Sequence, residues 1–171
     1  MRPGWDDYFL RIAKDVSTRA TCLRRQVGAI LVRNLRILTT GYNGPPAGIK
    51  HCADTGGCLR EKLKVPSGQR YELCKAIHAE VNAILQGAIH GVSVADSILY
   101  CTEMPCSGCA KLLINVGVKR IVIPENAAYA DELSANLLLE AGVTVERQLD
   151  VDKAEVSVCG PVSRVRRTDD V

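Results

Sequence analysis

One histidine and two cysteines in this chain have the types and spacing of a metal site. Cys106 and Cys109 are three residues apart, so on a helix their thiols lie on one face and can hold the same ion. His78 supplies an imidazole upstream. Two thiolates and one imidazole form a zinc set that leaves the fourth position open for water or substrate. We therefore expect His78, Cys106 and Cys109 to bind a catalytic Zn²⁺.

The neighbours of these ligands indicate where the metal lies. Pro105 keeps the residue before it extended and suits the start of a helix, so Cys106 and Cys109 should follow a strand and open a helix. Free N–H groups at a helix start favour the thiolate form of both cysteines. His78 and Glu80, two residues apart, can converge only in a first turn or its entry. The metal should lie between two helix N-termini.

Glu80 is the expected proton carrier. A zinc ion with two thiolates and a neutral imidazole is formally neutral, so it acidifies water less than an all-histidine site and needs a nearby base. Glu80 can take a proton from that water and pass it to a ring nitrogen and then to a departing amine. A Cys-x-x-Cys pair alone could instead be a structural zinc knuckle or a redox pair. The ordered pattern His-x-Glu followed by Pro-Cys-x-x-Cys is the signature of zinc deaminases and predicts hydrolytic deamination of a base.

A second group of metal-capable side chains gathers around a loop-like insertion at residues 49–75. Eight cysteines in a reducing compartment favour metal binding over a disulfide framework. The candidates are Cys22, His51, Cys52, Cys58 and Cys74. We favour the four cysteines as ligands of a second, structural zinc, with buried or free thiols as the alternative.

Two loops could contact a substrate. Residues 17–25 form a basic, hydroxyl-bearing connection that could hold a phosphate, although a solvated connection is the alternative. Asn43 lies in the turn-rich stretch 41–48, where its amide could offer a donor and an acceptor to a ligand or could serve only to form the turn.

Hydrophobic periodicity predicts helices alternating with strands. Trp5, Phe9, Ile12 and Val16 recur at helical spacing. The other expected elements are strands at 27–32 and 36–41 joined by a tight turn, a helix after 78, a strand at 97–102, a helix after 106, a strand at 121–123, a helix at 133–141 and a strand at 143–145. This order predicts an α/β fold of three layers, α/β/α, with a central mixed sheet of about five strands.

Length and composition fit one domain over residues 1–149, followed by a polar tail at 150–171 that is frayed or contacts another subunit. The net charge is only +3, from 22 basic and 19 acidic residues, which argues against nucleic-acid or membrane binding. The N-terminus lacks the apolar core of a signal peptide, and no run is long enough to span a bilayer. We expect a cytoplasmic protein.

Beyond its zinc motif, the chain resembles the deoxycytidylate (dCMP) deaminases, a branch of the cytidine deaminase-like superfamily. The zinc motif is common to the superfamily. The Gly-Tyr-Asn-Gly loop, Asn82 two residues after Glu80 and the N-terminal Trp-Asp helix narrow the likeness to the dCMP branch. The resemblance covers residues 5 to 147 and is carried by residues 5–9, 26–29, 41–44, 78–84, 105–109 and 141–143.

This resemblance implies conversion of dCMP to dUMP and ammonia, supplying dUMP for thymidylate synthesis. It also implies a homo-oligomer, commonly a hexamer, activated by dCTP and inhibited by dTTP, with Mg²⁺ able to accompany the regulatory nucleotide. The insertion resembles that of bacterial and phage members, some of which hold a second zinc. The implied roles are His78, Cys106 and Cys109 as zinc ligands, Glu80 as proton shuttle, Asn43 as a sugar contact, the backbone of Ala79 at the pyrimidine edge, and Ser17, Arg24 and Arg25 at the phosphate.

Rival functions make different predictions. A tRNA adenosine deaminase would use the same zinc core but needs a basic RNA-binding face, which the charge balance and the few aromatic residues do not supply. A deaminase of free cytidine or of a pterin-like base would not require a 5′-phosphate. A non-enzymatic protein, stabilised by zinc and serving in assembly or uptake, would not need Glu80.

Overall fold

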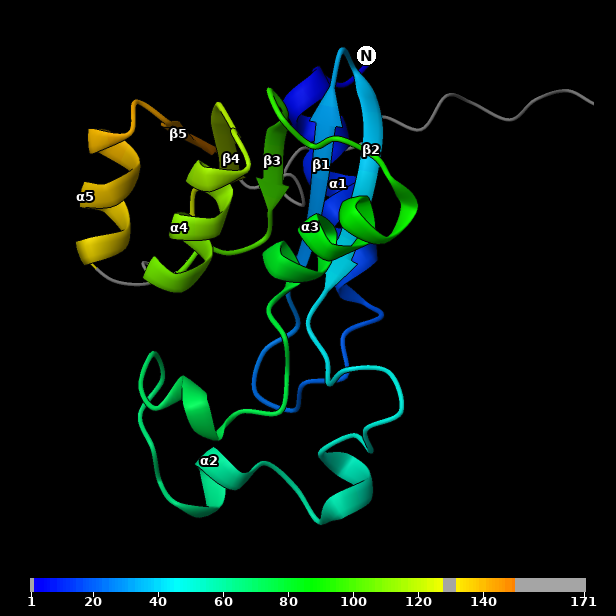
Figure 1. The fold of residues 1–171 in the computed structure, drawn as a ribbon, viewed down its shortest axis with the longest axis vertical. Coiled ribbons are helices and arrows are strands. Elements are labelled where there is room, and N and C mark those ends of the chain that lie inside the picture. The colour runs from blue at the N-terminus through cyan, green and yellow to red at the C-terminus, as the bar shows by residue number, and fades with distance from the viewer. Residues whose placement is uncertain (1, 128–131, 150–171) are drawn as a thin grey trace, which may run out of the picture.

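A five-stranded mixed sheet forms the centre of the molecule (Figure 1). The structure is a computed structural model that describes residues 2–127 and 132–149. The strand order is β2-β1-β3-β4-β5, in which β1 is antiparallel to both neighbours and β3, β4 and β5 run parallel. The strands are β1 (Gly28–Arg33), β2 (Arg36–Tyr42), β3 (Ile98–Cys101), β4 (Arg120–Pro124) and β5 (Thr144–Gln148).

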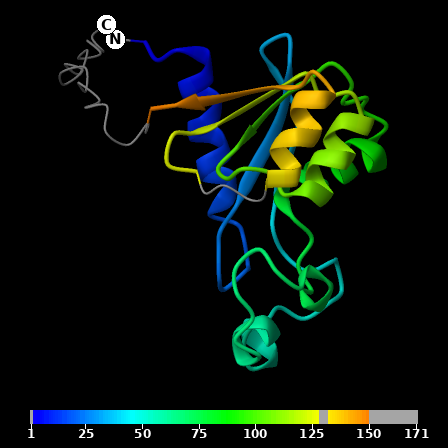
Figure 2. The same cartoon turned by 90° about the vertical axis from the view of Figure 1, so that its left-hand side faces the viewer.

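Helices cover both faces of this sheet, as Figure 2 shows for α1 on one side and α4 and α5 on the other. Side chains alternate along β1: Ile30 and Val32 pack with α1, whereas Ala29 and Leu31 join the core beneath the other helices. The predicted three-layer α/β/α fold is confirmed. The helices are α1 (Trp5–Ser17), α3 (Ala79–His90), α4 (Ser107–Asn115) and α5 (Glu132–Glu140).

The turns between these elements follow the sequence signals. Asn34 and Leu35 both have positive φ, which gives the β1–β2 hairpin the two-residue turn that suits the twist of paired strands. Gly91 ends α3 in the left-handed conformation with φ of 67°, so the helix runs past Gly87 to His90. Gly117 follows α4 and Gly142 follows α5, and both also have a positive φ.

The insertion between β2 and α3 extends beyond one end of the sheet (Figure 1). Its entry and exit are joined by the antiparallel bridge between Gly44 and Ile77, whose two N–H···O distances are 3.2 and 2.8 Å. Sequence periodicity did not predict the short helical turns inside it. These are η1 (Ala53–Thr55), α2 (Leu59–Lys62) and η2 (Tyr71–Leu73).

Glycine in β2 allows α3 to lie directly on the sheet. A Cβ on Gly41 would lie 2.2 Å from the Ala79 carbonyl oxygen and 2.4 Å from the Ala83 nitrogen. Only a residue without a side chain permits this approach. The first turn of α3, which carries Glu80 and follows His78, is thereby held against the strand.

A polar network joins α1 to the parallel strands. Arg120 donates to both carboxylate oxygens of Asp6 at 3.0 and 2.8 Å, and the hydroxyl of Tyr100 donates to Asp6 at 2.7 Å. Arg120 also forms an ion pair with Glu146 of β5. The hydrogen bonds from Arg120 hold the pKa of Asp6 below its usual value. The network therefore links strands β3, β4 and β5 to helix α1.

Across the described residues, no helix combines the length and the apolar character needed to cross a membrane. The predicted tail at 150–171 lies outside the described residues, and the single-domain assignment for 1–149 stays a prediction.

Candidate active site

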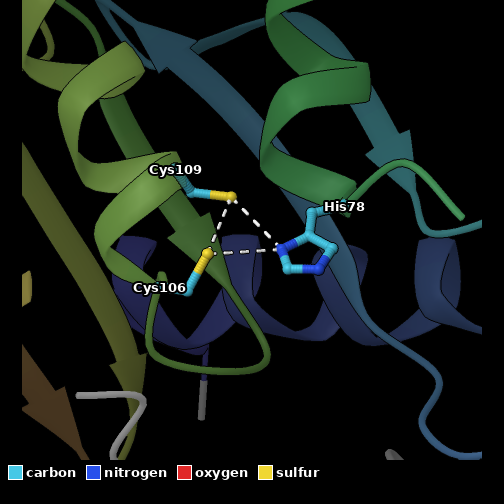
Figure 3. A group of neighbouring side chains, drawn as sticks. All are labelled: His78, Cys106 and Cys109. Carbon is cyan, nitrogen blue, oxygen red and sulfur yellow. Dashed lines mark hydrogen bonds between the residues drawn. The ribbon is translucent and has the colours of Figure 1, made fainter. Parts of the chain in front are cut away.

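The three predicted ligand atoms lie together between two helix starts (Figure 3). Nδ1 of His78 is 3.4 Å from the Sγ atoms of both Cys106 and Cys109, and the two Sγ atoms are 3.6 Å apart. A tetrahedral zinc with Zn–S about 2.3 Å and Zn–N about 2.0–2.1 Å places its ligand atoms about 3.5–3.8 Å from one another. The side chains therefore fit a zinc ion with a fourth position open.

Helix boundaries place these ligands. His78 is the N-cap of α3 and Cys106 is the N-cap of α4, both with extended backbone, and neither side chain is used in a capping hydrogen bond. Cys109 follows in the first turn of α4. The Cys106 carbonyl accepts the first helical bond of α4, from Ala110, at 2.8 Å. Local rules of helix initiation thus place all three side chains at helix starts, and the packing of α3 beside α4 brings the two starts together.

The two thiols are hydrogen-bonded to each other. This bond, against the cost of burial, lowers the pKa of the Cys106 thiol to about 4. The same bond raises the pKa of Cys109. Zinc would displace the thiol protons, because ligating cysteines bind as thiolates and release protons on metal binding.

Glu80 lies beside this set as a buried carboxyl. It is only 4% exposed and lines the same cavity as His78 and Cys106. Burial raises the pKa of Glu80 above its usual value. A carboxyl whose pKa is moved toward neutrality is suited to accept and return a proton within one reaction cycle.

A cavity of about 490 Å³ opens from these residues. Its size is within the range of small-molecule binding sites. One part of its wall comes from the first turn of α3 and the segment before α4, another from residues 21–25, and a third from the insertion. Three segments distant in sequence therefore enclose the volume next to the metal ligands.

Asn43 lines the cavity, but its amide is already bonded to the backbone. Its Oδ1 accepts from the Val27 N–H at 2.8 Å, and its Nδ2 donates to the Arg25 carbonyl at 2.8 Å. Asn43 therefore holds the loop before β1 in place, and a substrate could use only its remaining N–H or lone pair. Ala79, buried at the start of α3, also lines the cavity.

The structure separates the three phosphate candidates. Arg24 lines the cavity, and its Nη1 is buried without a hydrogen-bond partner among the described residues. Arg25 lines the cavity too, but it is exposed and its Nη1 lies 3.5 Å from a carboxylate oxygen of Glu103. The Ser17 hydroxyl donates to the Lys14 carbonyl at 2.6 Å at the end of α1, so the structure does not bring it to the cavity wall.

The four predicted second-zinc cysteines come near one another. Burial raises the pKa of Cys52, and the neighbouring Cys58, Cys74 and Cys22 add to this effect. All four line the large cavity. Among residues 2–127 and 132–149, however, only His78, Cys106 and Cys109 have ligand atoms all within 4.8 Å of one another. The second set is a neighbourhood of thiols rather than a closed ligand shell.

Sequence reasoning missed two residues of the insertion. The Tyr71 ring meets the His78 ring edge-on, with centroids 4.9 Å apart, and the Arg60 guanidinium lies 4.9 Å from the Tyr71 centroid. A hydrogen bond with Cys106 raises the pKa of His78, and burial and the charge of Arg60 act against that rise. No periodicity or motif marks either residue, because the contacts depend on the path of the insertion.

The chain is similar to known proteins over the region that contains the three ligand residues and Glu80. Residues 3–125 match the family model described as the cytidine and deoxycytidylate deaminase zinc-binding region. A deoxycytidylate deaminase of Schizosaccharomyces pombe is 36% identical over 148 residues, which are 86% of this chain and 45% of that protein. The chain thus spans less than half the length of this yeast relative.

Two phage proteins are similar over nearly their whole lengths. The deoxycytidylate deaminase of Mycobacterium phage D29 is 38% identical over 131 residues, covering 74% of this chain and 98% of the phage protein. The crystal structure of a dCMP deaminase from the cyanophage S-TIM5, in complex with dCMP and dUMP, superposes with a TM-score of 0.71 at 30% identity. That superposition covers 86% of this chain and 99% of the phage chain.

Proposed function

The chain belongs to the cytidine and deoxycytidylate deaminase zinc-binding family, and on this basis we propose that it hydrolyses dCMP to dUMP and ammonia. The observation that carries the proposal is the buried Glu80 carboxyl beside a three-ligand set at the wall of a nucleotide-sized cavity. Relatives named deoxycytidylate deaminases, and a phage relative whose structure holds dCMP and dUMP, support this choice of substrate.

The roles of the residues follow from their places. Zinc bound by His78, Cys106 and Cys109 would supply a Lewis acid that acidifies a water molecule. Glu80 would accept a proton from the attacking water as the water oxygen adds to C4 of the cytosine, and would pass that proton to N3. The carboxyl then transfers the second proton of the water to the exocyclic amine. The C4–N bond breaks and ammonia leaves.

We also propose that Cys22, Cys52, Cys58 and Cys74 hold a structural zinc. Their common location in the cavity wall, and the electrostatic influence of the other three thiols on Cys52, support it. Metal analysis of the purified chain should find two zinc ions, and C58S should retain one. A wild-type chain with a single zinc would contradict this assignment.

The family also supports a wider proposal about control. We expect a homo-oligomer, commonly a hexamer in such deaminases, that dCTP activates and dTTP inhibits. Light scattering gives the assembly size, and dCMP turnover titrated with each triphosphate gives the direction of control. A monomer whose rate neither nucleotide changes would remove this part of the proposal.

The central experiment measures ammonia release from dCMP, deoxycytidine and dCTP in parallel, with zinc content determined on the same preparation. Activity confined to dCMP supports the proposal. Activity on deoxycytidine alone would mean that the chain recognises no phosphate. Inactivity on all three, with zinc bound, would contradict the proposal and favour a deaminase of another base or a non-enzymatic role.

A further inference from the structure

Arg60 is a buried cation in the wall of the substrate cavity. The residue belongs to the short helix α2 of the insertion and is 6% exposed. Its Nη2 donates to the Pro66 carbonyl at 3.3 Å. Within residues 2–127 and 132–149, its Nε has no hydrogen-bond partner and its guanidinium forms no ion pair. Arginine is rarely buried without a counter-ion, so its charge calls for a partner from outside the chain.

Two ring contacts limit the distance between the Arg60 guanidinium and the metal-ligand residue His78. The guanidinium carbon is 4.9 Å from the centroid of Tyr71, and that ring is 4.9 Å from the ring of His78. Arg60 and His78 therefore contact the same Tyr71 ring, and both residues line the same cavity. In a nucleoside monophosphate the sugar separates the base from the phosphate by a comparable span. A base held at the metal would bring its phosphate toward Arg60.

A second cation shares this wall. Arg24 lines the cavity from the loop after α1, and its Nη1 is buried and unpartnered among the described residues. Arg25, in contrast, is exposed and lies near the carboxylate of Glu103. One buried guanidinium group and one partly buried one, each with a buried nitrogen that has no partner among the described residues, match the charge and the hydrogen-bonding capacity of a phosphate dianion.

We propose that Arg60, together with Arg24, binds the 5′-phosphate of the substrate and makes this chain select nucleotides over nucleosides. The inference rests on the proposed deamination of dCMP, since it names the part of the cavity that recognises the phosphate. A nucleoside would leave the buried Nε of Arg60 and the buried Nη1 of Arg24 without a partner, and a site built around hydrogen-bonding groups rejects a ligand that lacks their partner. The cysteine-bearing insertion thus contributes directly to substrate choice.

The test compares kcat/KM for dCMP and deoxycytidine in the wild type, R60A, R60K and R70A. R60A should lose on the order of 10²-fold in kcat/KM toward dCMP, because a charge on the phosphate has been left unpaired, and its ratio of kcat/KM for dCMP over deoxycytidine should fall by a similar factor. R60K should raise KM for dCMP more than it lowers kcat, since lysine keeps the charge but cannot bind two oxygens in a fork. R70A is the matched control, because Arg70 is exposed in the same insertion and pairs with Glu72; its change should stay within about 2-fold.

Zinc content and melting temperature show whether each variant is folded. An equal loss of R60A on dCMP and deoxycytidine, with zinc retained, would mean that Arg60 only supports the fold and would overturn the inference. A wild-type chain inactive on both substrates would contradict the deaminase proposal instead. In that case, and where the wild-type rate on deoxycytidine is too low to measure, Arg60 is judged by equilibrium binding of inorganic phosphate. R60A must bind phosphate more weakly than the wild type, and an equal affinity overturns the assignment.

Discussion

Replacing Gly41 by alanine should disable the site from a strand that contributes no catalytic group. The new Cβ would lie 2.2 Å from the Ala79 carbonyl oxygen, whereas ordinary contact begins at 3.4 Å. The Ala79 oxygen belongs to the backbone, so no side chain can turn away. The first turn of α3 must therefore move from β2 by roughly 1 Å, and a displacement of that size at a catalytic group can cost about 10²-fold in rate.

The same displacement has a cost in stability. Overpacking of a well-packed contact typically costs about 1–3 kcal/mol in the free energy of unfolding. The Cβ would also meet the Ala83 nitrogen at 2.4 Å, so relief along one direction creates a second clash. We expect the loss in the free energy of unfolding of G41A to lie at the upper end of that range. The variant should also lose zinc more readily, because His78 directly precedes the displaced turn.

The assay combines dCMP turnover, zinc content and thermal melting of G41A. G4A is the matched control, because a Cβ on Gly4 would approach its nearest heavy atom, in Asp7, only to 3.4 Å. G4A should keep its rate and its zinc. A G41A protein with wild-type kcat/KM and melting temperature would refute the reasoning that close contact between β2 and α3 positions His78 and Glu80.

Three further changes test other parts of the structure. E80Q should retain zinc and lower dCMP turnover at least ~10²-fold, because the amide cannot accept the proton; near-normal turnover would remove Glu80 from the mechanism. C106S should release the catalytic zinc and abolish activity, and a variant that kept both would disprove the ligand assignment. D6N should lower the free energy of unfolding by about 1–2 kcal/mol at neutral pH, since it weakens partly exposed charge-assisted hydrogen bonds to Arg120. Because the pKa of Asp6 is lowered from 3.8, this stabilisation is complete above pH 3.8 and is lost as pH falls through the lower folded value. Unfolding curves of D6N and the wild type should therefore converge in acid, and a difference that persisted there would show that the ion pair is not its source.

Much of the site could be predicted because its geometry is local. Cys106 and His78 occupy helix N-caps, and Cys109 follows one turn on, so the rules for starting a helix place each ligand, while the packing of α3 beside α4 brings the two helix starts together. The alternation of helical and extended patterns likewise predicted the layered fold, since each pattern records which face of an element is buried. Family resemblance then indicated the substrate.

The walls of the cavity depended on tertiary structure. From its sequence position, Ser17 was as good a phosphate candidate as Arg24, yet it packs at the end of α1 while Arg24 turns a buried nitrogen into the cavity wall. The cation–π contact of Arg60 with Tyr71, and the edge-on contact of Tyr71 with His78, had no sequence signal. An irregular insertion has no repeating period from which a buried face can be read. The sequence alone therefore determined the fold class and the set of three zinc-capable side chains, and it predicted Glu80 as the proton carrier, because motif spacing and the rules of helix initiation specify these residues. Only the tertiary structure decided which cations line the cavity, because that depends on how distant segments pack together.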